Sequence, residues 1–295
     1  MLLGASGDDA RYEPYLSALG SAPASDKIFA VSSYCPITVL EQADAAYEWQ
    51  FSDVRDYEAI EVSMLDYGVE RKKVSGTLSD EQSALAQTLS QQFPAMLNHW
   101  QLRDDKQQPL LLDEHGEGSF KTYVTDFLRA SAQSALERGE DLSGHDWLRV
   151  EDGRVVAVDF ERYAHATKRL KRPPAFDALD LSSGENELFG NETQPKRHFT
   201  AFAQAQSQAD KVLMAEEEVV NLMNPMNFIE NSPTSHYRIR VGSKDSDTSL
   251  AISAMLHAKL KQEGKDSDYV LAWEKGHAGD YDLEALFTWI EECVR

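Results

Sequence analysis

The chain has 295 residues, of which 42% are apolar and 27% charged, as is ordinary for a globular protein with room for one large domain. Fifty acidic against 29 basic residues give a formal net charge of −21, which argues against nucleic acid or an anionic membrane as a partner. No apolar run reaches the ~18 residues that a membrane-spanning helix needs.

The first 40 residues combine a helix end with a buried strand. The opening MLLGASG reads as the end of a helix that runs into a turn, and Ser6 belongs to that turn. Residues 27–38, KIFAVSSYCPIT, are short, apolar and interrupted by Pro36, which predicts a strand over 28–37 that is buried on both faces. Such a strand is typical of an α/β sheet.

The two cysteines of the chain, Cys35 and Cys293, are too few for a disulfide framework. A reducing compartment is therefore expected, which favours the cytoplasm. Cys35 lies in the apolar run just described, so we expect it to be a buried packing residue.

Residues 41–222 have a different pattern. A capping box at residues 79–82 begins one amphipathic helix, and a second covers residues 120–135. Asp152-Gly153 is the predicted turn of a hairpin, and Asp159 is the predicted cap of a helix that reaches Leu170. Residues 171–194 read as a loop rich in proline, glycine and acids. The sequence predicts a mostly helical insertion.

The α/β pattern returns in residues 223–295. Strands are predicted over 237–241 and 268–273, each followed by an amphipathic helix. Strand–helix–strand–helix at this spacing predicts parallel pairing. We therefore expect a core made of residues 1–40 and 223–295, interrupted by the insertion of residues 41–222.

Polar loops follow both of these strands. Asp245 comes after the first and His277 after the second, and catalytic groups gather at the carboxyl ends of strands in parallel sheets. An acid followed by a histidine is the order in α/β-hydrolases. His277 would act as general base toward a serine and Asp245 would hold its tautomer. No cofactor is expected, and His277 with Asp280 and Asp282 matches no familiar metal-ligand spacing.

Four stretches closely resemble bacterial tannases, the α/β-hydrolase esterases that cleave galloyl esters: YRIRVGSKDSDTSLAI, LAWEKGHAGDYDLEALFTWI, LMNPMNFI and IFAVSSYCPITVLEQADAAYEWQF. The similarity extends from Leu2 to the end of the chain. It implies an α/β-hydrolase-type parallel sheet with a large, mostly helical inserted lid domain over 41–222. It also implies that Asp245 is the catalytic acid and His277 the catalytic histidine.

The resemblance further implies a substrate site for the three ring hydroxyls of gallate. Its residues would be Asp247, Lys171 and Glu185, and neighbouring charged residues leave the register of the last two open. Phenolic hydroxyls donate hydrogen bonds to carboxylates, and a lysine favours a phenolate-like oxygen. Without the resemblance, Lys171 and Glu185 would be read as parts of a solvated charged loop.

The nucleophile of the family is missing. It is the serine of a Gly-x-Ser-x-Gly elbow, and no such motif occurs in residues 1–295. The resemblance therefore implies the C-terminal portion of a longer serine esterase, whose first strands, elbow and oxyanion hole lie upstream. Such a chain would be inactive alone, would associate with the missing N-terminal half, and would be poorly soluble or oligomeric because of an unpaired strand edge.

Three functions remain open on the sequence. The first is a galloyl esterase with a small phenolic ester as substrate. The second is a related serine esterase for hydroxycinnamoyl or other aryl esters. The third is an inactive fragment that only binds polyphenols or a partner protein.

Overall fold

The computed structural model describes the backbone of residues 1–65 and 68–295, and the side chains outside residues 60–71. Its main sheet has three parallel strands in the order β1-β6-β7, which confirms the predicted parallel pairing. The strands are β1 (Ala30–Tyr34), β6 (His236–Gly242) and β7 (Asp266–Ala272). In β6 every residue after His236 is buried, because this strand lies in the middle of the sheet.

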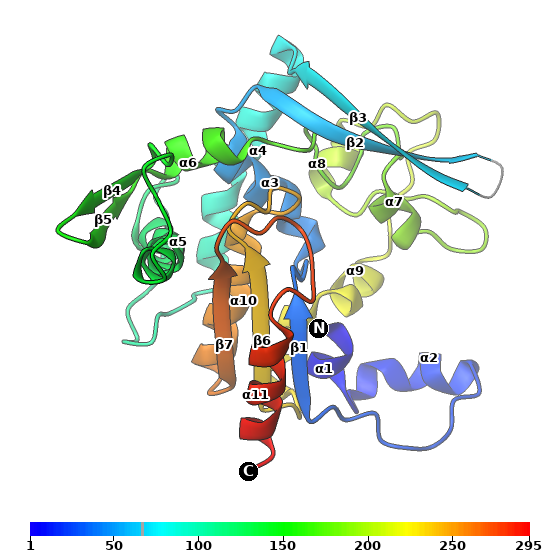
Figure 1. Ribbon diagram of the computed structural model, residues 1–295. Coiled ribbons are helices and arrows are strands. Elements are labelled where there is room, and N and C mark those ends of the chain that lie inside the picture. Colours follow the sequence, from blue (N-terminus) through cyan, green and yellow to red (C-terminus); the bar gives the residue numbers. More distant parts are fainter. Residues whose placement is uncertain (66–67) are drawn as a thin grey trace.

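Helix α10 (Leu250–Gln262) covers one face of the sheet (Figure 1). Ten of its 13 residues are buried, since β6 and β7 as well as α3 (Leu40–Phe51) and α5 (Ser119–Glu137) contact it. Ser249 caps its start by accepting from the N–H of Ala251, and Gly264 follows its end with a φ of 71°. The predicted strand–helix–strand unit is therefore formed as expected.

The first strand is shorter and less buried than predicted. It covers Ala30–Tyr34 instead of residues 28–37, and Ser32 is exposed. Phe29 is 61% exposed. The prediction of burial on both faces was wrong because β1 is an edge strand in the described sheet, and an apolar run does not distinguish an edge strand from a central one.

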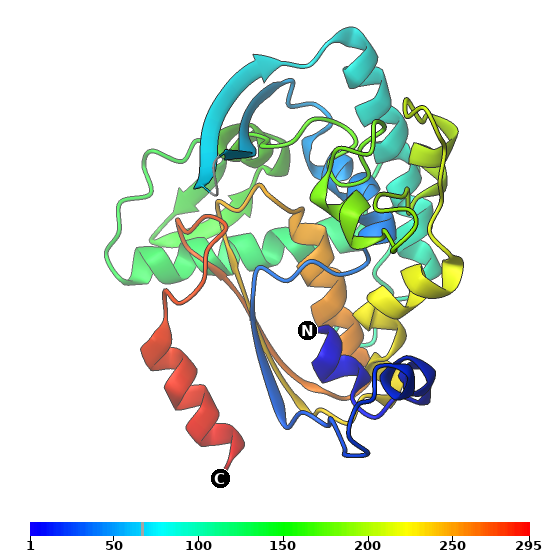
Figure 2. The same cartoon turned by 90° about the vertical axis from the view of Figure 1, so that its right-hand side faces the viewer.

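The last helix, α11 (Leu283–Cys293), lies on the other side of the sheet from α10 (Figure 2). Figure 2 shows it standing away from the strands, and none of its residues is buried. Its apolar residues Leu283, Phe287 and Ile290 are 41–62% exposed. Within the described part of the chain this amphipathic helix has no apolar surface to cover it.

Residues at the start of the chain form α1 (Leu2–Ser6), η1 (Ala10–Tyr12) and α2 (Glu13–Ala18). Ser6 ends α1, and its hydroxyl donates to the Leu2 carbonyl at 2.9 Å. The side chain is buried and satisfies a local backbone group; Ser6 is the last residue of the helix, one residue before the turn in which it was expected.

Residues 41–222 contain helices and two antiparallel hairpins. The helices after α3 are α4 (Asp80–His99), α5, α6 (Phe160–Thr167), α7 (Gly184–Leu188), α8 (Ala201–Ala205) and α9 (Glu217–Met223), followed by η2 (Pro225–Asn227) and η3 (Ile229–Asn231). The hairpins are β2 (Asp56–Leu65) with β3 (Gly68–Thr77), and β4 (Leu148–Glu151) with β5 (Arg154–Val158). In the described residues, no helix has the length and apolar character that crossing a membrane requires.

The predictions in this segment that depend on a few neighbouring residues are confirmed. Ser79 and Gln82 form the capping box of α4, and Asp152-Gly153 is the turn between β4 and β5, with positive φ at both residues. Asp159 caps α6, but the helix stops at Thr167 because Lys168 has a φ of 63°. The long β2–β3 hairpin at the top of Figure 1 was not predicted.

Candidate active site

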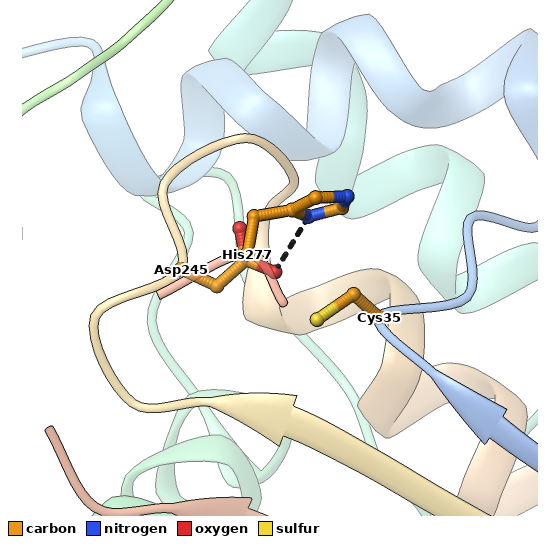
Figure 3. A group of neighbouring side chains, drawn as sticks. All are labelled: Cys35, Asp245 and His277. Carbon is orange, nitrogen blue, oxygen red and sulfur yellow. Dashed lines mark hydrogen bonds and ion pairs between the residues drawn. The ribbon is translucent and has the colours of Figure 1, made fainter. Parts of the chain in front are cut away.

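Asp245 and His277 meet at the carboxyl ends of β6 and β7 (Figure 3). Nδ1 of His277 lies 3.0 Å from Oδ2 of Asp245. The carboxylate is fully buried, whereas the histidine side chain is 47% exposed. The second ring nitrogen faces away from Asp245, as a general base oriented by an acid requires (Figure 3).

Backbone hydrogen bonds tie together the two loops that carry this pair. Ser243 N–H donates to the Ala272 carbonyl and Lys244 N–H to the Lys275 carbonyl, each at 2.8 Å. The Glu274 N–H donates to the Ser243 hydroxyl at 2.8 Å. The two loops are therefore bonded directly to each other, and the distance between acid and histidine depends on both.

Gly242 allows the loops to approach each other. A Cβ at this position would lie 2.1 Å from the Lys275 carbonyl oxygen and 2.4 Å from that of Gly276. Both are backbone atoms, so no side-chain rotation can relieve the overlap. The sequence analysis did not single out Gly242, although its place at the end of a predicted strand was a usable signal.

Two buried tyrosines support the acid loop from residues 41–222. The Tyr163 hydroxyl donates to the Ser243 carbonyl at 2.8 Å, and that of Tyr47 donates to the Ser246 carbonyl at 2.9 Å. The N–H of Asp247 also donates to Oδ1 of Asp245 at 2.9 Å. Both tyrosines lie in helices at positions that read as ordinary apolar ones, so the sequence carried no signal for this role.

The hydrogen bond to Asp245, followed by the neighbouring thiol of Cys35, raises the pKa of His277 to about 10. The ring is therefore an imidazolium at neutral pH in this chain. A general base has to be neutral, so the ring could act as one only if its pKa were lowered. Covering the half-exposed ring would do this, because burial disfavours the charged form.

A cavity of about 740 Å³ lies next to the pair. Lys171 and Asp247 both line it, and their side chains form an ion pair at 3.6 Å. Nζ of Lys171 also lies 3.9 Å from the centre of the Phe176 ring. Oδ2 of Asp247 is 3.9 Å from Nδ1 of His277, so Asp247 connects the histidine to the cavity.

Lys171 is held in place through its backbone. The Tyr47 hydroxyl accepts from the N–H groups of Leu170 and Lys171 at 3.0 and 3.1 Å. Just before them, Arg169 forms a fully buried ion pair with Glu48 at 2.5 Å. Tyr47 therefore bonds to both the acid loop and the Lys171 segment.

Glu185, the third predicted substrate residue, is not brought to this cavity. It lies in the first turn of α7 and is half-buried. Ser182 and Ser183 line the cavity, but Glu185 is not among the described residues that do. The structure therefore brings together four of the five predicted site residues.

The wall of the cavity is stabilised by a second acid, histidine and serine. Nδ1 of His198 lies 2.7 Å from Asp177, and Nε2 lies 2.9 Å from the Ser207 hydroxyl. The other oxygen of Asp177 accepts from the backbone N–H groups of residues 199 and 200. Because Asp177 and His198 are fully buried, we interpret these bonds as structural links between residues 177–186 and 198–207.

Cys35 was expected to be buried, and this prediction was wrong. It lies half-exposed just after β1 with a φ of 44°, and its thiol donates to the Ala278 carbonyl at 3.5 Å. Among the described residues, one group of three metal-binding side chains comes together, namely Cys35, Asp245 and His277. Asp282, which the sequence analysis considered beside His277 as a metal ligand, lies in another cluster: it accepts a hydrogen bond from the Tyr34 hydroxyl at 2.5 Å and pairs with Arg238 and Arg240.

No family model matches this sequence, and no curated protein matches it. Solved structures do match: the tannase of Lactobacillus plantarum has 41% identity and a TM-score of 0.95, and that of Fusobacterium nucleatum has 43% and 0.95. The chain is tannase-like over its whole length. Both comparisons cover 100% of this chain and 64–65% of the tannase chains. The resemblance to tannases is thereby confirmed.

A tannin acyl hydrolase in complex with ethyl gallate matches this tannase-like chain with 42% identity and a TM-score of 0.93. That comparison covers 100% of this chain and 62% of the other. The tannase-like chain thus spans less than two-thirds of the length of these relatives.

Proposed function

We propose that this tannase-like chain is the C-terminal portion of an α/β-hydrolase-type serine esterase that hydrolyses galloyl esters. Residues 1–40 and 223–295 would be its core segments and residues 41–222 its lid. The observation that carries the proposal is the position of Asp247, whose carboxylate lies beside both His277 and Lys171 at a cavity of about 740 Å³. Pockets of this size hold small ligands.

In this proposal the nucleophilic serine comes from a segment ahead of Met1. His277 takes the serine proton as the hydroxyl attacks the ester carbonyl, and then gives it to the leaving alcohol. Asp245 keeps Nδ1 protonated and stabilises the imidazolium. Water then attacks the acyl-serine ester: His277 takes a proton from the water and gives it to the serine oxygen as the acid product leaves.

The substrate ring would lie in the cavity beside Asp247 and Lys171. Asp247 accepts hydrogen bonds from phenolic hydroxyls, and Lys171 donates to an oxygen with phenolate character. Glu185 enters the proposal through the resemblance alone, since it is not among the described residues that line the cavity. A ring without hydroxyls would leave Asp247 and Lys171 without their ligand partners.

The test is a chimera in which the part of the Lactobacillus plantarum tannase outside the match is fused ahead of residues 1–295. It should hydrolyse methyl gallate, whereas the 295-residue chain alone should not. His277→Ala should lower kcat by about 10⁴-fold. His115→Ala, at an exposed histidine, is the matched control and should leave kcat unchanged. Full turnover by the His277→Ala chimera would contradict the proposal.

The choice of ester is tested on the same chimera. Methyl benzoate should be rejected by about 10⁴-fold relative to methyl gallate, and Asp247→Asn should lower kcat/KM for the gallate ester selectively. Equal turnover of feruloyl and galloyl esters, unaffected by Asp247→Asn, would favour the aryl esterase alternative. Calorimetry of gallate with the 295-residue chain shows whether it binds a phenol without turnover.

A further inference from the structure

Three side chains that bind divalent cations meet at the carboxyl end of the sheet (Figure 3). Cys35 follows β1, Asp245 follows β6 and His277 follows β7. One ligand atom of each lies within 4.8 Å of those of the other two. We propose that these residues form a Zn²⁺ site, with a thiolate, a carboxylate oxygen and a ring nitrogen at three corners of a tetrahedron.

The geometry is close to that of a tetrahedral site. Zn²⁺ binds sulfur at about 2.3 Å and nitrogen or oxygen at about 2.0–2.2 Å, so the ligand atoms of a tetrahedron lie roughly 3.3–3.8 Å apart. Oδ2 of Asp245 and Nδ1 of His277 are 3.0 Å apart, slightly closer than that. The thiol has to move by no more than about 1.0–1.5 Å, since no ligand-atom separation exceeds 4.8 Å.

The surroundings of the three residues suit a bound cation. Asp245 is fully buried, and the Asp247 N–H holds its Oδ1 at 2.9 Å, so Oδ2 is directed toward His277. Supporting hydrogen bonds of this kind orient metal ligands. His277 and Cys35 are only partly covered, which leaves a path for the ion and a fourth position for water.

The ligand types favour Zn²⁺ over the hard cations of the cell. A thiolate and an imidazole select Zn²⁺, whereas Mg²⁺ and Ca²⁺ prefer oxygen ligands. Binding releases two protons to solvent, one from the thiol and one from the ring nitrogen. The metal would then replace the hydrogen bond between Asp245 and His277, so an esterase that contains this chain would be inhibited.

The test uses the 295-residue chain and Co²⁺ as a coloured substitute for Zn²⁺. One equivalent of Co²⁺ should give a thiolate-to-metal charge-transfer band and the visible bands of a tetrahedral site, and Zn²⁺ should abolish both. Cys35→Ser should remove the charge-transfer band and weaken Zn²⁺ binding at least about tenfold. Cys293→Ser changes the only other cysteine and should keep the band.

A second measurement needs no variant and covers the case in which Cys35→Ser does not fold. Zn²⁺ should slow the alkylation of Cys35 by iodoacetamide, mapped by peptide mass spectrometry, and should not protect Cys293. Equal alkylation of Cys35 with and without Zn²⁺, or an unchanged band in a folded Cys35→Ser chain, would overturn the site. Zn²⁺ binding does not depend on esterase activity, so a chimera without galloyl turnover leaves this proposal standing.

Discussion

Asp44 lies in helix α3, and its carboxylate is buried beneath the segment that contains residues 176 and 177. Its two oxygens accept from the N–H groups of Phe176 and Asp177 at 2.7 and 3.2 Å. Burial, with the nearby carboxylates of Asp177 and Glu48, nevertheless raises the pKa of Asp44 to about 7. The two N–H donors lower this pKa but do not outweigh desolvation.

This raised pKa predicts that Asp44 stabilises the folded chain more at acidic pH than at neutral pH. The ordinary pKa of 3.8 lies below the folded value, so the folded state binds more protons between about pH 4 and pH 7. The contribution of Asp44 to the free energy of unfolding should therefore fall by up to ~4 kcal/mol as pH rises through this window. Urea unfolding of Asp44→Asn should lack this component, and Asp53→Asn, at an exposed neighbour, should keep it. Parallel pH profiles for the wild type and Asp44→Asn would contradict the prediction.

His277 should titrate far above an ordinary histidine in this chain. Because it is a cation stabilised by Asp245, its contribution to stability is complete below pH 6.5 and is lost as pH rises through about 10. The ring is half-exposed, so this contribution is about 1 kcal/mol or less. NMR of the ring protons should show the high midpoint, and Asp245→Asn should bring it down. Asp266→Asn is the matched control: it removes a carboxylate beside His236 and should leave the titration midpoint of His277 unchanged.

At the scale of elements, the junction between β6 and the histidine loop determines the geometry of the site. Gly242→Ala places a methyl group against the carbonyls of Lys275 and Gly276. It should cost about 1–3 kcal/mol of unfolding free energy and separate the loops, because backbone has to shift. Urea unfolding measures the cost, and the NMR midpoint of His277 reports the separation.

Gly276→Ala is the matched control for this prediction. It lies in the histidine loop that Gly242 faces, but nothing lies within 4 Å of where its Cβ would be. It should leave both measurements close to those of the wild type. Equal effects of the two substitutions would show that the loop tolerates no added methyl group, whatever its contacts.

At the scale of the whole molecule, the sheet is covered unequally on its two faces. Helix α10 is enclosed between strands and helices, whereas α11 has no buried residue and stands apart from the sheet (Figure 2). Phe287 is 62% exposed and Val294 is 68% exposed. Exposed apolar patches of this kind mark interaction surfaces or promote aggregation.

We therefore expect the 295-residue chain to self-associate through α11. Phe287→Lys should lower the weight-average mass in sedimentation velocity, because it places a charge in the middle of the apolar face. Leu188→Lys, at a leucine of α7 that is 51% exposed, is the matched control and should not change it. A monomeric wild type at all concentrations would refute this expectation.

Signals that act over a few residues were readable from the sequence. The alternation in β6, the capping box at Ser79 and the Asp152-Gly153 turn all predicted the elements that form. The order of Asp245 and His277 after two parallel strands predicted that they would lie at one edge of the sheet. These predictions hold because backbone geometry relates neighbouring residues directly.

The sequence by itself therefore determined the parallel unit and which loops lie at its carboxyl edge. The tertiary structure alone decided that Cys35 approaches His277, that Tyr47 bonds to two loops, that Glu185 does not line the cavity and that α11 is uncovered. Hydrophobic periodicity shows which side of an element is apolar but not what covers that side. Contacts between residues more than 100 positions apart depend on how all the elements pack, and no local pattern contains that information.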